Sequence, residues 1–225
     1  MAIPFETFTL AAATADLGDE PAAREHADCV EFRMDLAAEP RSALGSYDGE
    51  LPLLVTNRPT WEGGEADDEG RLPALEAAVE HDAVGAVDIE LAALEDNAAA
   101  RSLADHAHGN DASVVVSTHD FEATPARSTL VDLLERAGTY GDVAKLAVTA
   151  TDRSDALDVL AATHEATQKG TTVATMAMGE AGSHTRAVAP VYGSQIGYAP
   201  VDPAEATAPG QYDLATLREL VSSLA

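Results

Sequence analysis

The chain has 225 residues, and its 39 Asp and Glu against 13 Lys and Arg give a formal net charge of −26 at pH 7. This length is enough for one sizeable core, so we expect a single domain over residues 1–225. So much negative charge argues against nucleic acid and anionic membranes as partners. Because the screening length falls to roughly 3 Å near 1 M salt, such a surface is typical of adaptation to a salty cytoplasm.

The sequence shows no sign of secretion or membrane insertion. Cys29 is the single cysteine, so no intrachain disulfide can form. The first residues lack a basic stretch and include Glu6, which argues against a signal peptide. The longest uncharged run, 187–201, is shorter than the ~20 residues of a membrane span and is broken by proline and glycine. We therefore expect a soluble, cytoplasmic protein.

Short apolar runs alternate with longer, alanine-rich and acidic segments of helical character along the whole chain. We expect strands at 8–13, 29–34, 52–57, 86–91, 113–118, 143–148, 172–177 and 193–199. We expect helices at 20–27, 70–81, 96–107, 124–138, 152–169 and 213–224. Ser154 and Asp213 are suitable helix starts, and Gly138 and Gly170 are suitable stops.

This alternation, without hairpin signals, predicts an α/β fold with a parallel sheet. About eight repeats indicate closure into a (β/α)8 barrel, known as a TIM barrel. An open doubly wound sheet is the alternative, but no GxGxxG motif follows the first strand. In a barrel the chemistry belongs at the C-terminal ends of the strands, so the polar residues there are the candidates.

Charged residues mark the second and third strands. Glu31, Arg33 and Asp35 alternate with apolar neighbours, so the period of two puts all three on one face. A surface strand held by ion pairs would show the same pattern. Arg58 ends the third strand and precedes the Glu-Gly-Gly-Glu loop 62–65, which an ordinary glycine-rich turn would also explain.

The next two strands offer carboxylates and a histidine. Asp88 and Glu90 share a face, where they could join a histidine in a magnesium or manganese site or make hydrogen bonds inside the barrel. His119 follows the fifth strand directly, where a barrel keeps its acids and bases, although a loop or capping histidine is the alternative. The other six histidines lie in helix-like or loop segments and are expected to be solvated.

Lys145 is one of only two lysines and lies inside the apolar sixth strand. It could protect a sheet edge from aggregation, yet a closed barrel has no edge and a buried lysine is costly without a purpose. At its usual pKa of about 10.4, roughly 1 lysine in 10³ is neutral near pH 7, and only the neutral amine attacks a carbonyl. Apolar walls and nearby guanidinium groups would both favour the neutral form.

Two loops complete the candidate site. Arg186 lies in the glycine-containing loop 178–186 after the seventh strand, and residues 207–211 follow the eighth. Such long loops either close over a substrate as lids or are mobile connections without a function. Met176 and Met178, at the end of the seventh strand, are most simply interpreted as core residues. Positive charge is thus concentrated at predicted strand ends in an acidic chain. It favours a small anionic substrate with a carbonyl, because arginine binds a carboxylate through two parallel hydrogen bonds.

Seven stretches together resemble, in order and spacing, the type I 3-dehydroquinate dehydratase family. They are Glu31 to Asp35, Arg58 with Glu62 to Glu65, Asp88 to Leu91, Ser117 to Phe121 with Thr124 and Pro125, Lys145 to Ala147, Met178 to Arg186, and Ala208 to Gln211. The resemblance implies a (β/α)8 barrel lyase that converts 3-dehydroquinate to 3-dehydroshikimate and water in the shikimate pathway. It implies no metal and no organic cofactor, and it allows a homodimer.

The resemblance also implies residue roles. Lys145 would form an imine (Schiff base) with the ring ketone, and the protonated imine would accept electrons from the neighbouring carbon. His119 would be the general base and then the general acid, with Glu62 orienting it. The residues matching substrate contacts are Glu31, Arg33, Arg58, Arg186, Thr207 and Gln211.

The chain departs from the family at two places, and two other functions stay open. Thr207 stands where serine is common and keeps the hydroxyl, and Tyr198 stands where phenylalanine is common. A Schiff-base aldolase would share the barrel lysine, but a phosphorylated substrate favours glycine-lined amides over Arg186 and Gln211. A non-catalytic acidic binding domain would leave the clustered arginines unexplained.

Overall fold

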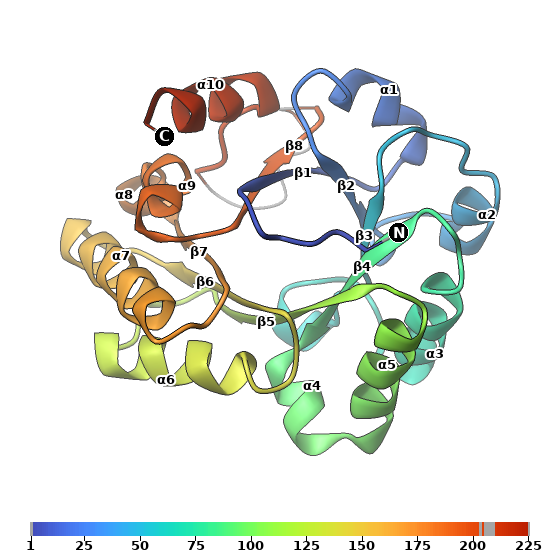
Figure 1. Cartoon of the computed structure of the whole chain (residues 1–225), viewed down its shortest axis with the longest axis horizontal. Coiled ribbons are helices and arrows are strands. Elements are labelled where there is room, and N and C mark those ends of the chain that lie inside the picture. Colours follow the sequence, from blue (N-terminus) through green and yellow to red (C-terminus); the bar gives the residue numbers. More distant parts are fainter. Residues whose placement is uncertain (1, 203, 205–209, 225) are drawn as a thin grey trace.

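The computed structural model describes residues 2–202, 204 and 210–224 of the chain. Its strands form one parallel sheet in the order β7-β6-β5-β4-β3-β2-β1-β8, with helices on the outside of the ring (Figure 1). The strands are β1 (Thr9–Thr14), β2 (Cys29–Arg33), β3 (Leu53–Thr56), β4 (Val84–Glu90), β5 (Ser113–Asp120), β6 (Val143–Thr149), β7 (Val173–Met178) and β8 (Ile196–Pro200). Each overlaps the strand that the sequence predicts.

The sheet closes on itself. β1 pairs with both β2 and β8, so that Ala11 lies between Cys29 and Tyr198. At the seam, Val173 and Ser194 form a parallel bridge, and the amide of Gln195 donates to the carbonyl oxygen of Val173 over 2.7 Å. The predicted (β/α)8 barrel is therefore confirmed, and the doubly wound alternative is wrong.

The helices occupy the expected segments with changed lengths. The α-helices are α1 (Glu20–Ala23), α2 (Pro40–Gly45), α3 (Asp68–Ala78), α4 (Leu91–Asp96), α5 (Ala98–Gly109), α6 (Arg127–Ala137), α7 (Arg153–Gln168), α8 (Gly179–Gly182), α9 (Thr185–Val188) and α10 (Leu214–Leu224). The 3-10 helices are η1 (Leu17–Asp19), η2 (Thr60–Glu62) and η3 (Ala189–Tyr192). The helices that the sequence did not predict have six residues or fewer, too short for a helical period to be read.

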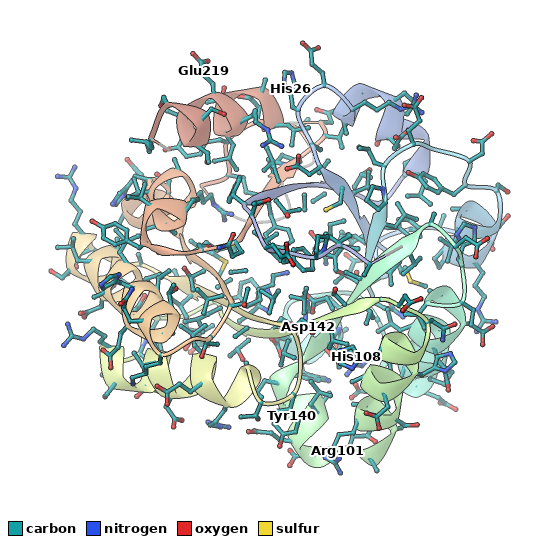
Figure 2. All side chains as sticks on the ribbon, in the orientation of Figure 1. His26, Arg101, His108, Tyr140, Asp142 and Glu219 are labelled. Atoms are coloured by element: carbon teal, nitrogen blue, oxygen red, sulfur yellow. The ribbon has the colours of Figure 1, made fainter. Side chains whose placement is uncertain are left out.

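The strands present two different faces. Outward residues such as Phe32, Ile89 and Leu146 are buried against the helices. Near the N-terminal ends of the strands, the side chains that point into the barrel are apolar and small or medium in size, for example Cys29 and Val115. Two residues further along β2, β4, β5 and β6 the inward side chains are polar, namely Glu31, Asp88, Ser117 and Lys145, because alternate residues of a strand share a face. Figure 2 shows that side chains fill the ring of strands, so the interior is a packed core.

The N-terminal segment covers the bottom of the barrel. It runs across the ring of strands and is dark blue in Figure 1. The amide of Ile3 donates to the carbonyl oxygen of Gly85 over 3.0 Å, and the Ser113 hydroxyl donates to the carbonyl oxygen of Ile3 over 2.8 Å. The side chains of Ile3 and Phe5 are buried. A short extended segment thus closes the end of the barrel opposite the candidate site.

Nearly all of the negative charge lies on the surface. Among the described residues, the buried acidic side chains are Glu20, Glu31, Asp35, Glu62, Asp88 and Glu90. The others are half-buried or exposed and repel one another across the surface.

The described part of the chain contains no helix that is both long and apolar enough to cross a bilayer.

We expect the midpoint of thermal unfolding to rise by about 10 °C between about 0.1 M and about 2 M KCl, because salt screens the repulsion between surface carboxylates. Differential scanning calorimetry measures this shift. Sucrose at the same osmolality, which does not screen charge, is the control. A midpoint that stays constant with KCl, or that rises equally in sucrose, would contradict the interpretation.

Candidate active site

A cavity opens at the C-terminal ends of the strands and encloses about 530 Å³, including the part open to solvent. Its walls include every described residue that the sequence predicts for the site, namely Glu31, Arg33, Arg58, Glu62, His119, Lys145, Arg186 and Gln211. Thr207 lies outside the described residues. Residues from six strands, β2, β3 and β5 to β8, and from the loops that follow them therefore converge on one small-molecule pocket.

Lys145 lies at the bottom of this cavity. It points inward from β6, and only 5% of the residue is exposed. Its Nζ lies 3.0 Å from Asp88 Oδ2, 3.5 Å from Glu31 Oε1 and 4.2 Å from the ring centroid of Tyr198. The barrel has no free edge at β6, so the edge-protecting interpretation of this lysine is wrong.

Asp88 is held as a carboxylate beneath the lysine. Its Oδ1 accepts a hydrogen bond from Ser117 Oγ at 2.6 Å and forms an ion pair with Arg58 Nη2 at 2.8 Å. Burial alone would raise the pKa of Asp88, but the charges of Arg58 and Lys145 and the Ser117 hydrogen bond outweigh it and hold that pKa well below its usual range. Asp88 therefore carries a negative charge directly beside Lys145.

Arg58 connects Asp88 with Glu90. Its Nη1 donates to Glu90 Oε1 at 2.8 Å and to Ser117 Oγ at 2.6 Å. Glu90 Oε2 accepts from Arg71 Nη1 at 2.7 Å. The oxygens of both carboxylates are thus bonded to cationic or hydroxyl side chains. The hydrogen-bonding interpretation of the pair Asp88 and Glu90 is confirmed.

His119 and Glu62 form a pair at the side of the cavity. Glu62 Oε1 lies 2.9 Å from His119 Nδ1 and also accepts the backbone N–H of His119 over 2.9 Å. An oxygen that accepts the amide is best matched by a protonated Nδ1, which leaves the Nε2 lone pair bare. Burial, together with the charges of Arg58 and Lys145, places the pKa of His119 well below its usual value. The imidazole of His119 is thus uncharged at neutral pH.

Burial also raises the pKa of Glu62 to about 8, although Arg58 opposes this shift. Two further features fix the pair. The ring of Phe121 is parallel to the imidazole of His119, with centroids 5.8 Å apart. Gly63, with φ +79°, packs so tightly on Phe121 that a Cβ would lie 2.3 Å from the ring. Glycine is required there both for its backbone conformation and for space.

Two further arginines, Arg33 and Arg186, line the cavity. Arg33 donates to both carboxylate oxygens of Asp35, at 2.9 Å and 2.6 Å, and its side chain is 11% exposed. The surface-strand interpretation of β2 is therefore wrong. Arg186 is 5% exposed, and its Nη1 lies 3.6 Å from Met176 Sδ. Burial lowers the pKa of Arg186 to about 10, which still leaves a cation at neutral pH.

Several residues that line the cavity were not predicted from the sequence. Met176 and Met178, interpreted as core residues, are buried but also line the cavity. Their inward position follows from β7, whose register places Ala174 beside Lys145 and Met176 beside Ala147. Tyr198 lies next to Lys145, and its buried hydroxyl makes no hydrogen bond within the described part of the chain. The period of two along β7 was the signal that could have placed the methionines.

Comparison with known proteins agrees with this geometry. Residues 5–225 match the family model described as type I 3-dehydroquinase. The 3-dehydroquinate dehydratase of Haloarcula marismortui is 66% identical over 224 residues, which cover 98% of this chain and 97% of that protein. The one from Halobacterium salinarum is 56% identical over 223 residues, with 98% and 99% covered.

A solved structure shows the same likeness. The crystal structure of 3-dehydroquinate dehydratase from Geobacillus kaustophilus has a TM-score of 0.85 and 28% sequence identity, and the match covers 97% of this chain and 91% of that one. With a family model that spans almost the whole chain and relatives of such high identity, the chain belongs to the type I 3-dehydroquinase family.

Proposed function

We propose that this protein is a lyase that converts 3-dehydroquinate to 3-dehydroshikimate and water, in the shikimate pathway, through an imine at Lys145. The observation that carries the proposal is a buried amino group at the bottom of a small cavity whose walls hold a neutral histidine and three arginines. The printed activity of the relative at 66% identity supports the choice of substrate.

The first step is attack of the neutral Lys145 amine on the ring ketone. A C–N bond forms, and the ketone oxygen takes up protons and leaves as water, which gives a protonated imine. Asp88 at 3.0 Å and Glu31 at 3.5 Å from Nζ lie where the positive charge of that imine develops. Carboxylates fixed in advance in a water-poor site stabilise such a charge without reorganising.

The second step is elimination. His119 Nε2 removes a proton from the carbon next to the imine, and the C–H electrons move into the protonated C=N bond to give an enamine. The enamine electrons then expel the hydroxyl from the next carbon, which takes the proton from the His119 imidazolium and leaves as water. Attack of water on the imine releases the product and restores Lys145. Glu62 holds the ring and stabilises the imidazolium between the two transfers.

The substrate carboxylate is assigned to Arg186, and Gln211 also lines the cavity. A guanidinium group matches a carboxylate through two hydrogen bonds, and burial strengthens both. Arg33 and Glu31 are assigned to the ring hydroxyls, and Asp35 keeps the guanidinium of Arg33 in place. The contact with Thr207 and the homodimer stay predictions.

Borohydride reduction in the presence of 3-dehydroquinate should fix the substrate on the peptide that contains Lys145, because hydride converts the imine to a stable secondary amine. Peptide mass spectrometry identifies the site. Lys169 is the matched control, since it is the other lysine and is paired with Glu165 on the surface. Lys169→Arg should keep the adduct and Lys145→Arg should lose it. An adduct on Lys169, or none, would refute the mechanism.

His119→Ala should keep imine formation measurable and lower kcat by about 10²–10⁴-fold, because only the proton transfers lose their base. Stopped-flow trapping and steady-state kinetics separate the two steps. His108→Ala is the control, because this exposed histidine pairs with Asp142 on the outside of the barrel (Figure 2). Turnover of His119→Ala near the wild-type rate would show that the base is another group.

The pH dependence should report Glu62. Its pKa of about 8 means that kcat/KM rises with pH as Glu62 ionises, because the carboxylate is the form that stabilises the His119 imidazolium. The limb below this value should disappear in Glu62→Gln, which keeps an acceptor for Nδ1–H but cannot ionise. A limb near pH 8 that persists in Glu62→Gln would assign it to a different group.

A further inference from the structure

Arg71 is a buried cation outside the cavity. It lies on α3, and 4% of the residue is exposed. Its Nη1 donates to Glu90 Oε2 at 2.7 Å and its Nε to Asp68 Oδ1 at 3.2 Å. The guanidinium carbon also lies 5.6 Å from the ring centroid of Trp61, which directly precedes Glu62. Arg71 therefore reaches inward to the charged groups under the cavity and outward to the loop that carries Glu62.

A bend in the backbone directly before Arg71 directs its side chain toward the barrel interior. α3 is interrupted at Glu69 and Gly70, which have non-helical dihedral angles, and the regular helix continues from Arg71. Gly70 has φ +86°, and a Cβ there would meet nothing within 4 Å, so the conformation and not the space favours glycine. The side chain of Asn57 donates to the carbonyl oxygen of Arg71 over 3.2 Å and ties this bend to the end of β3.

Arg71 belongs to a cluster of buried charged groups in the cavity wall and directly beneath it. The three carboxylates Glu31, Asp88 and Glu90 are all buried there. The three cations that contact them are Arg58, Arg71 and Lys145. Within this group Arg58 is shared, since Nη2 contacts Asp88 and Nη1 contacts Glu90. Arg58 can serve both carboxylates because the other oxygen of Glu90, Oε2, is paired with Arg71.

We propose that Arg71 is a positioning residue for Lys145. Because Arg71 neutralises Glu90, Arg58 remains available to pair with Asp88. Asp88 is then shared between Arg58 and Lys145, and Lys145 is not the only cation bound to it. The proposal rests on the imine chemistry proposed above. Without Arg71, Glu90 attracts both amino groups of Arg58, and Asp88 keeps only Ser117 and Lys145. The ammonium form of Lys145 is then favoured, and less neutral amine is available for attack.

The charged groups that surround Lys145 make this effect specific. Glu31 of β2, Arg58 next to β3, Asp88 of β4 and His119 of β5 face it, together with the ring of Tyr198. β7, which pairs with β6, has no titratable side chain. Arg58 is therefore the group through which a change at Glu90 reaches Asp88 and the lysine.

The test follows borohydride-trappable imine formation against pH in the full-length protein in KCl. Three variants are compared with wild type: Arg71→Met, Arg71→Lys, and Arg71→Met combined with Glu90→Gln. We expect Arg71→Met to slow imine formation about 10-fold near pH 7 and to move its pH midpoint up by about one unit. Arg71→Lys keeps the charge and should keep the midpoint. The double variant removes both charges and should return the midpoint toward wild type.

The outcomes are distinct. An unchanged midpoint in Arg71→Met, or a double variant as shifted as the single one, overturns the proposal. A loss of stability or an increase in KM without a shift in midpoint shows a merely structural role and overturns it as well. If Arg71→Met does not fold, the double variant decides: a wild-type midpoint supports the proposal and a shifted one refutes it. Absence of a Lys145 adduct in wild type would instead refute the proposed function.

Discussion

The contact between Asp88 and Lys145 is the interaction on which the rest of the site depends. Burying an amino group is unfavourable, and the carboxylate at 3.0 Å compensates it. Ser117 and Arg58 also bind Asp88, so the carboxylate that compensates the burial of Lys145 is itself held in place by two further side chains.

Much of the fold could be read from the sequence, because eight apolar runs separated by helical segments leave few alternatives to a closed parallel barrel. The closure between β7 and β8 could not be predicted from the sequence, because it is made by an isolated bridge between Val173 and Ser194. Short helices such as α2 and α4 span too few residues for a period to be detected.

The site was predictable where charge stands out against an apolar strand, as at Lys145, or follows a strand directly, as at His119. It was not predictable where the side chain is apolar or comes from a helix. Met176 looks like any core residue, and the inward path of Arg71 depends on a backbone bend at Gly70 that sequence periodicity does not reveal. The period of two placed Arg33 and Asp35 on one face of a strand, but their pairing inside the cavity is established only by the distances between their side-chain atoms.

The acidic exterior has a consequence for how a substrate encounters the enzyme. At low salt, a protein with a net charge of −26 repels an anion long before that anion reaches the arginines of the cavity. Near 1 M salt the field of the surface carboxylates decays within roughly 3 Å, so that an approaching anion is nearly indifferent to them. In molar salt, binding of an anionic substrate therefore depends on the short-range contacts inside the cavity. The number of surface carboxylates can then increase, and with it the hydration of the surface, without weakening the binding of an anion.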